Sequence, residues 1–195
     1  MNPLLERNSY FVKEHVGMFK AANNFDIFDP AANQAILLCR EPNLGFFTKM
    51  LRFTDYKRYT PFHVEITDTA NRPVLHIKRG VSIFRSVVEV LDEKGQKIGS
   101  FRQKLLSIGG KFEVLDAQEK TVCWLKGSWT SWDFRFEQDG RQLAQVTKKW
   151  SGLGKELFTS ADNYMLIIDD TVPAKDPVRQ LILAAVMCID MVLKE

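Results

Sequence analysis

Short stretches of alternating apolar and polar residues recur along most of the chain, each followed by a polar turn and a second apolar stretch. Five segments follow this pattern: NFDIFDPAANQAILLCRE, FHVEITDTANRPVLHIKR, SVVEVLDEKGQKIGSFRQK, KFEVLDAQEKTVCWLKG and WDFRFEQDGRQLAQVTKK. Asp68, Asp92 and Asp116 stand 24 residues apart in them, and Asp139 follows 23 residues later. Alternation with a period of two is typical of half-buried strands, so each segment predicts a β-hairpin.

The predicted strands are numerous enough to suggest a closed sheet. Two more strands are expected at residues 10–13 and 163–168, which brings the total to about twelve. Gly95 and Gly140 stand in turns where a positive φ is wanted. An open antiparallel sheet leaves two unpaired edges, and closure into a barrel removes them. Only residues 41–60 do not fit strands, and NLGFFTKMLRF within them favours a short helix.

The last twenty residues, DPVRQLILAAVMCIDMVLKE, predict a helix over about 177–193. Asp176 is a suitable N-cap, and Pro177 suits the first helical position. Thirteen of the sixteen residues from Val178 to Leu193 are apolar. At 1.5 Å per residue this helix is about 24 Å long, whereas a bilayer core is about 30 Å thick. Asp190 would also be costly at the centre of a membrane, so a transmembrane span is not expected.

The polar residues of this helix fall on one narrow stripe, which contains Arg179, Val186 and Asp190. Almost all the remaining circumference is apolar and must be covered on every side. We therefore expect the helix to lie inside a closed barrel, whose lumen is wide enough to hold it. A membrane-inserted tail and a dimer contact are the alternatives.

Composition points to an ordinary globular protein. The 195 residues suit a single domain, 1–195, with 27 Lys and Arg against 24 Asp and Glu. A net charge of +3 does not indicate nucleic-acid binding.

Cys39, Cys123 and Cys188 are far apart in apolar stretches, so we expect buried reduced thiols in a cytoplasmic protein. The first residues lack the apolar region of a signal peptide and a myristoylation glycine, and the last lack a prenylation box.

Residues 145–195 resemble the C-terminal end of the phospholipid scramblase family. The resemblance rests on the Lys-x-Trp-x-Gly core, the FTSADNY stretch and the closing apolar helix, and the NNFDIFD and FHVEITD strands fit the same family. The family belongs to the tubby-like superfamily, together with plant LURP-one-related proteins. The resemblance implies a mainly β fold, an antiparallel barrel of twelve strands around a central hydrophobic C-terminal helix.

The resemblance also implies a calcium site in the loop that begins at Ser160. Asp162, Asp169 and Asp170 are the candidate ligands there, but Met165 and Thr171 stand where a calcium loop would have Gly and an acidic residue. No other cofactor is expected. The Pro-rich arm and the palmitoylated cysteine cluster of animal scramblases have no counterpart in this sequence. Without two anchoring signals we expect peripheral membrane association at most.

Two groups of residues are candidates for binding. The densest basic cluster is the best candidate for anionic lipid headgroups, and it consists of Lys49, Arg52, Lys57 and Arg58. His63 and His76 flank the TDTANRP turn, and a register that pairs Val64 with Leu75 would place them opposite each other on the polar face. They could hold a metal, although no third ligand is apparent. His15 has no recognisable partner.

Four tryptophans bracket the fifth hairpin and suit core or barrel-rim positions. They are Trp124, Trp129, Trp132 and Trp150. No nucleophile elbow or phosphate loop occurs in the sequence.

The leading hypothesis is therefore a non-enzymatic scramblase-family protein that engages anionic phospholipid at the cytosolic membrane surface, with transbilayer scrambling as a narrower claim. The alternatives are an enzyme or a small-molecule or metal-binding protein with its site at the barrel mouth, and a protein-interaction scaffold. The oligomeric state is left open.

Overall fold

The computed structural model describes residues 2–15, 24–42, 60–81, 87–103, 111–128, 132–148 and 163–193. Apart from the short 3-10 helix η1 (Pro3–Leu5), these ranges hold twelve strands and one α-helix. The strands are β1 (Ser9–Glu14), β2 (Phe25–Asp29), β3 (Gln34–Arg40), β4 (Phe62–Asp68), β5 (Pro73–Arg79), β6 (Val87–Asp92), β7 (Lys97–Gln103), β8 (Phe112–Asp116), β9 (Thr121–Ser128), β10 (Asp133–Gln138), β11 (Arg141–Thr147) and β12 (Asn163–Ile168), and the helix is α2 (Val178–Leu193).

The strands form one closed antiparallel barrel. Each strand pairs with its neighbours in sequence, and β1 closes the ring against β12. In β4, buried Phe62, Val64 and Ile66 alternate with half-exposed residues, as a wall with one apolar face requires. The predicted twelve-stranded barrel is confirmed, with the five hairpins where the alternation placed them.

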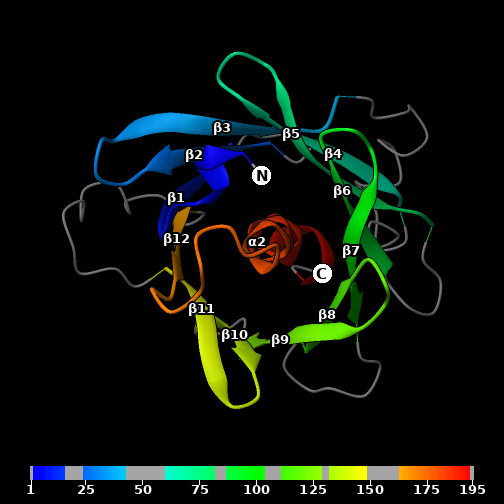
Figure 1. Ribbon diagram of the computed structural model, residues 1–195. Coiled ribbons are helices and arrows are strands. Elements are labelled where there is room, and N and C mark those ends of the chain that lie inside the picture. Colours follow the sequence, from blue (N-terminus) through cyan, green and yellow to red (C-terminus); the bar gives the residue numbers. More distant parts are fainter. Residues whose placement is uncertain are drawn as a thin grey trace.

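The helix α2 lies inside the ring of strands, as the view along the barrel in Figure 1 shows. Ile182, Ala184, Val186 and Met187 are all fully buried. The Sγ atom of Cys39, on β3, lies 3.4 Å from the Sδ atom of Met187. The prediction of an enclosed helix is confirmed, and the membrane tail and the dimer contact are not what the structure shows. Among the described residues, none of the helices has the length and apolar character needed to cross a bilayer.

The start of α2 is fixed by its predicted N-cap and by a buried cation. The Oδ1 atom of Asp176 accepts a hydrogen bond from the Val178 N–H at 2.9 Å. Arg179, on the polar stripe of the helix, is only 2% exposed. Its guanidinium donates to the backbone oxygens of Val172, Pro173 and Arg7, and to the side chain of Asn8. Burial is tolerated because oxygens surround the charge. The side chain of Asp190 lies outside the described atoms.

The three aspartates spaced 24 residues apart occupy the same position in three hairpin turns of the same type. The Oδ1 atom of Asp68 accepts hydrogen bonds from the N–H groups two and four residues later, and Asp92 and Asp116 do the same in their hairpins. The third residue after each aspartate has a positive φ, and these residues are Asn71, Gly95 and Glu119. Each aspartate therefore closes its hairpin by satisfying backbone donors that the turn leaves unpaired.

Candidate functional site

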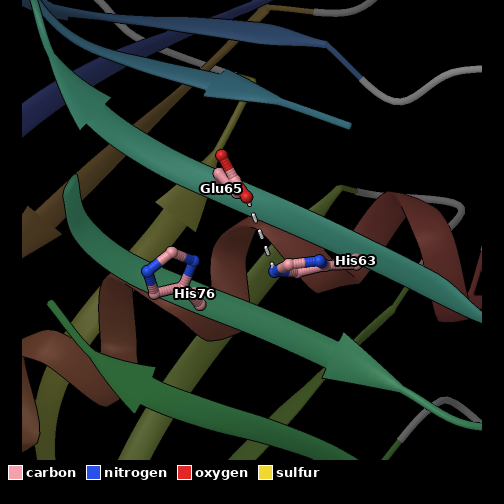
Figure 2. A group of neighbouring side chains, drawn as sticks. All are labelled: His63, Glu65 and His76. Atoms are coloured by element: carbon pink, nitrogen blue, oxygen red, sulfur yellow. Dashed lines mark ion pairs between the residues drawn. The ribbon is translucent and has the colours of Figure 1, made fainter. Parts of the chain in front are cut away.

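Two histidines and a glutamate meet on the outer wall of the barrel, over β4 and β5. His63 and Glu65 project from β4 and His76 projects from β5, as Figure 2 shows. One nitrogen or oxygen atom from each of the three lies within 4.8 Å of the others. His63 Nε2 lies 3.9 Å from Glu65 Oε1, and the centroids of the two imidazole rings are 5.7 Å apart. Among the described residues, this is the one group of three His, Cys, Asp or Glu side chains close enough to share a metal ion.

The strand register explains why the three side chains converge. Residues i and i+2 of a strand face the same side of a sheet, which places His63 and Glu65 together. Glu65 pairs directly with His76 across the ladder, and His63 pairs with Lys78. The predicted pairing of Val64 with Leu75 is therefore wrong, because Val64 pairs with Ile77 instead. A bulge after Ile66 and the Asp68 turn set this register, and the two-residue shift leaves every side chain on its predicted face.

Both imidazoles carry a nitrogen that lacks a hydrogen-bond partner. His63 Nε2 and His76 Nδ1 are shielded from solvent and make no hydrogen bond. The 3.9 Å separation from Glu65 is too long for such a bond. Burial, with a smaller contribution from the Lys78 charge, lowers the pKa of His63 below its usual value. At neutral pH its ring is therefore uncharged and keeps a lone pair.

The basic residue nearest Glu65 on the adjacent strand is engaged elsewhere. Arg40 pairs with Glu65 in the β3–β4 ladder, but its guanidinium donates to Asp26 Oδ1 at 2.5 Å and to the Phe25 carbonyl oxygen at 2.7 Å. His15 Nε2 lies 2.7 Å from the other Asp26 oxygen, a partner that the sequence did not reveal. Burial alone would raise the pKa of Asp26, but hydrogen bonds from Arg40 and His15 outweigh it and lower this pKa.

A separate cleft of about 530 Å³ opens at the barrel end where α2 begins. Its apolar surface includes side chains from β7, β11 and the first turns of α2, namely Ile98, Leu143, Val178 and Leu181. Charges of both signs also line it, and these are Lys97, Arg141, Asp116 and Asp176. Its volume lies in the range of small-ligand sites.

The structure places the histidines on the barrel wall and not at this mouth. The sequence missed Glu65 as the third member of their cluster, although its i+2 spacing from His63 was a usable signal.

The candidate lipid-headgroup residues Lys49, Arg52, Lys57 and Arg58 lie outside the described residues, as do Asp162 and the short helix expected within 41–60.

The other two calcium candidates lie in the turn after β12. Asp169 accepts hydrogen bonds from the N–H and hydroxyl of Thr171, which lower its pKa. Asp170 Oδ1 accepts a hydrogen bond from Asn8 at 2.5 Å. Both carboxylates thus have protein partners, and the calcium site stays a prediction.

The described tryptophans have packing roles. Trp132 stacks on Tyr164 and meets Phe134 edge-on, next to the core. Trp124 is half-buried on β9, with the Lys111 ammonium 4.8 Å from its ring centroid. Trp129 and Trp150 lie outside the described residues. All three cysteines are free and buried, as expected.

Comparisons with known proteins find a matching family model, a yeast relative and a solved plant structure of similar fold. The family model described as Scramblase matches residues 4–195. The yeast protein "Altered inheritance rate of mitochondria protein 25" of Saccharomyces cerevisiae is 24% identical in an alignment of length 192, with coverage of 85% of this chain and 58% of the yeast protein. The chain thus spans little more than half the length of this relative. A protein of Arabidopsis thaliana solved by X-ray crystallography has a similar fold, with a TM-score of 0.58, 15% identity, and coverage of 98% of this chain and 96% of the plant protein.

Proposed function

The chain belongs to the Scramblase family and has the tubby-like fold, and on that premise we propose that it is a non-enzymatic protein that binds phospholipid at a membrane surface. The cytosolic face of the membrane, where anionic lipids concentrate, is the proposed site of action.

The observation that carries this proposal is the cleft at the end of the barrel. Because α2 fills the lumen, a ligand has to bind at a barrel end or on the outer wall. Ile98, Leu143 and Leu181 give the cleft an apolar surface that suits the first carbons of an acyl chain. Arg141 on its lining suits a lipid phosphate, whereas the Lys97 ammonium is already paired with Glu89 and Glu119. In this proposal the cleft holds the first carbons of a lipid's acyl chain next to the phosphate of its headgroup.

The central helix limits how lipid is engaged. Residues 182–187 of α2 include four fully buried side chains, and each large apolar one contributes about 1.5–3 kcal/mol to folding. Withdrawal of α2 into a bilayer would forfeit that core. Lipid contact in this proposal therefore leaves the barrel closed.

Co-sedimentation with vesicles tests lipid binding directly. Vesicles that contain phosphatidylserine should retain the protein at low salt, and raised salt should weaken the retention. The variant Arg141→Gln and a variant with Leu143→Asp should bind less, because each removes one part of the cleft. Vesicle binding absent at low salt would refute the proposal.

The basic residues Lys49, Arg52, Lys57 and Arg58 are part of the same proposal as headgroup contacts. Their joint change to Gln lowers the net charge from +3 to −1 (+3 − 4). A matched control variant removes the same number of positive charges elsewhere, from three strands of the outer wall and from one hairpin turn. It replaces Lys13, Lys94, Lys126 and Arg135, which are all exposed. Equal binding by both variants would show that only net charge matters and that these four positions form no site.

Transbilayer scrambling is a narrower activity that needs its own assay. Exchange of a fluorescent lipid between the leaflets of reconstituted vesicles measures it, with and without calcium. An unchanged exchange rate in both conditions would exclude scrambling while leaving surface binding intact.

A further inference from the structure

We propose that His63, Glu65 and His76 form a binding site for a divalent transition-metal ion, Zn²⁺, on the outer wall of the barrel. This site is separate from the lipid cleft and does not depend on the proposed lipid binding.

The first argument is convergence. The three side chains belong to adjacent strands, and the ladder that pairs Glu65 with His76 holds their backbones in fixed register. Their ligand atoms already lie within 4.8 Å of one another, and Figure 2 shows the three side chains gathered over the two strands. Tetrahedral zinc with bonds of about 2.1 Å needs ligand atoms about 3.4 Å apart. In the proposed site, rotations of the three half-exposed side chains close this difference while the strands stay paired.

The second argument is the pair of unsatisfied nitrogens. A buried polar atom without a partner is destabilising, and native structures contain few of them. Here two such atoms, His63 Nε2 and His76 Nδ1, belong to the same cluster. A shared ligand that accepts both lone pairs accounts for their position, whereas a purely structural pair would be expected to hydrogen-bond.

The third argument is charge. The Glu65 carboxylate brings negative charge next to the two imidazoles, which favours a divalent cation. Lys78 opposes it, but this side chain is exposed, so solvent screens its charge. Arg40 is held by Asp26 and does not neutralise Glu65. The carboxylate is therefore available to a cation.

The ligand types decide which ion fits. Two nitrogens and one carboxylate oxygen are a zinc ligand set, with a fourth position left for water. Calcium requires six to eight oxygens and is a poor match. The cluster is thus chemically distinct from the calcium loop suggested by the family resemblance.

The experiment uses the untagged full-length protein, stripped of metal with a chelator. Co²⁺ serves as the spectroscopic probe, since tetrahedral coordination gives strong visible absorption, and Zn²⁺ serves as competitor. We expect one Co²⁺ per chain, displaced by Zn²⁺ but not by Ca²⁺. His63→Gln and His76→Gln should each weaken binding about a hundredfold, and Glu65→Gln about tenfold or more.

His15→Gln is the matched control, because it removes a histidine that pairs with Asp26 and lies outside the cluster. It should bind Co²⁺ as tightly as the natural protein. Thermal unfolding without metal verifies that each variant is folded, and added Zn²⁺ should raise the midpoint only for proteins with the intact cluster. The proposal is overturned if the natural protein binds no Co²⁺ or Zn²⁺ at micromolar concentrations. It is equally overturned if His63→Gln and His76→Gln bind like the natural protein.

Discussion

The guanidinium of Arg179, in the first turn of α2, donates a hydrogen bond to the backbone oxygen of Arg7 at 2.9 Å, although the two residues are 172 positions apart. The same guanidinium also donates to Asn8 Oδ1 at 2.8 Å, just before β1 begins. One buried side chain thus ties the start of the central helix to the start of the barrel wall.

Replacing this arginine should destabilise the whole barrel. Arg179→Met leaves several carbonyl oxygens without donors, and we expect the free energy of unfolding to fall by about 3 kcal/mol. Arg179→Lys should also be destabilising, because an ammonium cannot reach the same set of oxygens. Urea unfolding followed by circular dichroism measures both. Arg135→Met, at an exposed arginine on β10, is the control and should change stability by less than about 0.5 kcal/mol.

Gly99 on β7 lies where the barrel wall packs tightly against Leu181 of the helix. A Cβ atom there would lie 2.3 Å from the Leu115 backbone oxygen and 2.7 Å from Leu181 Cδ2. Gly99→Ala should therefore lower the free energy of unfolding by about 1–3 kcal/mol, since a strand or the helix must shift. Gly80→Ala is the control, because nothing lies within 4 Å of the added atom. Equal stability of the two variants would contradict the packing described for β7.

The central helix should be indispensable for folding. Deletion of Asp176–Glu195 removes the filling of the barrel, and we expect an unfolded or aggregated product in circular dichroism and gel filtration. A point variant sharpens the test: Ala184→Asp places an unpaired charge at a fully buried position and should cost several kcal/mol. Gln180→Asp, at a half-exposed position in the first turn of α2, is the milder control. A folded, monomeric deletion product would show instead that the segment is an appendage.

The carboxylate of Asp68, in the first of the three aspartate turns, should make the stability of the fold depend on pH. Hydrogen bonds from the Arg72 backbone and side chain hold the pKa of Asp68 below its usual value. The folded state therefore binds fewer protons than the unfolded state at acid pH. The stabilisation is present above about pH 4, the ordinary aspartate range, and is lost as the pH falls through the folded-state pKa.

Urea unfolding across a pH series measures this effect. Asp68→Asn should lose less stability on acidification than the natural protein, because the titrating group is absent. Glu93→Gln, which removes an exposed carboxylate from the next hairpin turn, should follow the natural protein. Parallel pH profiles for the natural protein and Asp68→Asn would exclude the proposed role of this carboxylate.

The local pattern of apolar, polar and turn residues was sufficient to predict the strands, the hairpin turns and the central helix of this fold. Alternation in FHVEITD and its counterparts located the strands because one face of each strand is buried. The aspartates located the turns because their side chains bond to local backbone donors. The near-complete apolar surface of α2 required enclosure, and a ring of strands was the available enclosure.

The candidate sites were less predictable. His63 and His76 were expected to share a face, and they do, because a shift of two residues does not change the face. Which residue lies opposite His76 depends on a bulge and a turn geometry that alternation does not encode, so Glu65 was missed. The cleft could not be predicted from the sequence either, since it is lined by strand ends, turns and the start of α2 that lie far apart in sequence.

The sequence alone therefore determined which residues form strands, which turn, and which helix must be buried, because each of these depends on neighbours within a few positions. Tertiary structure alone decided that Glu65 lies opposite His76 in the ladder and that Arg179 binds Arg7 and Asn8. Both contacts depend on the register and closure of the barrel, which are set by the packing of the whole ring.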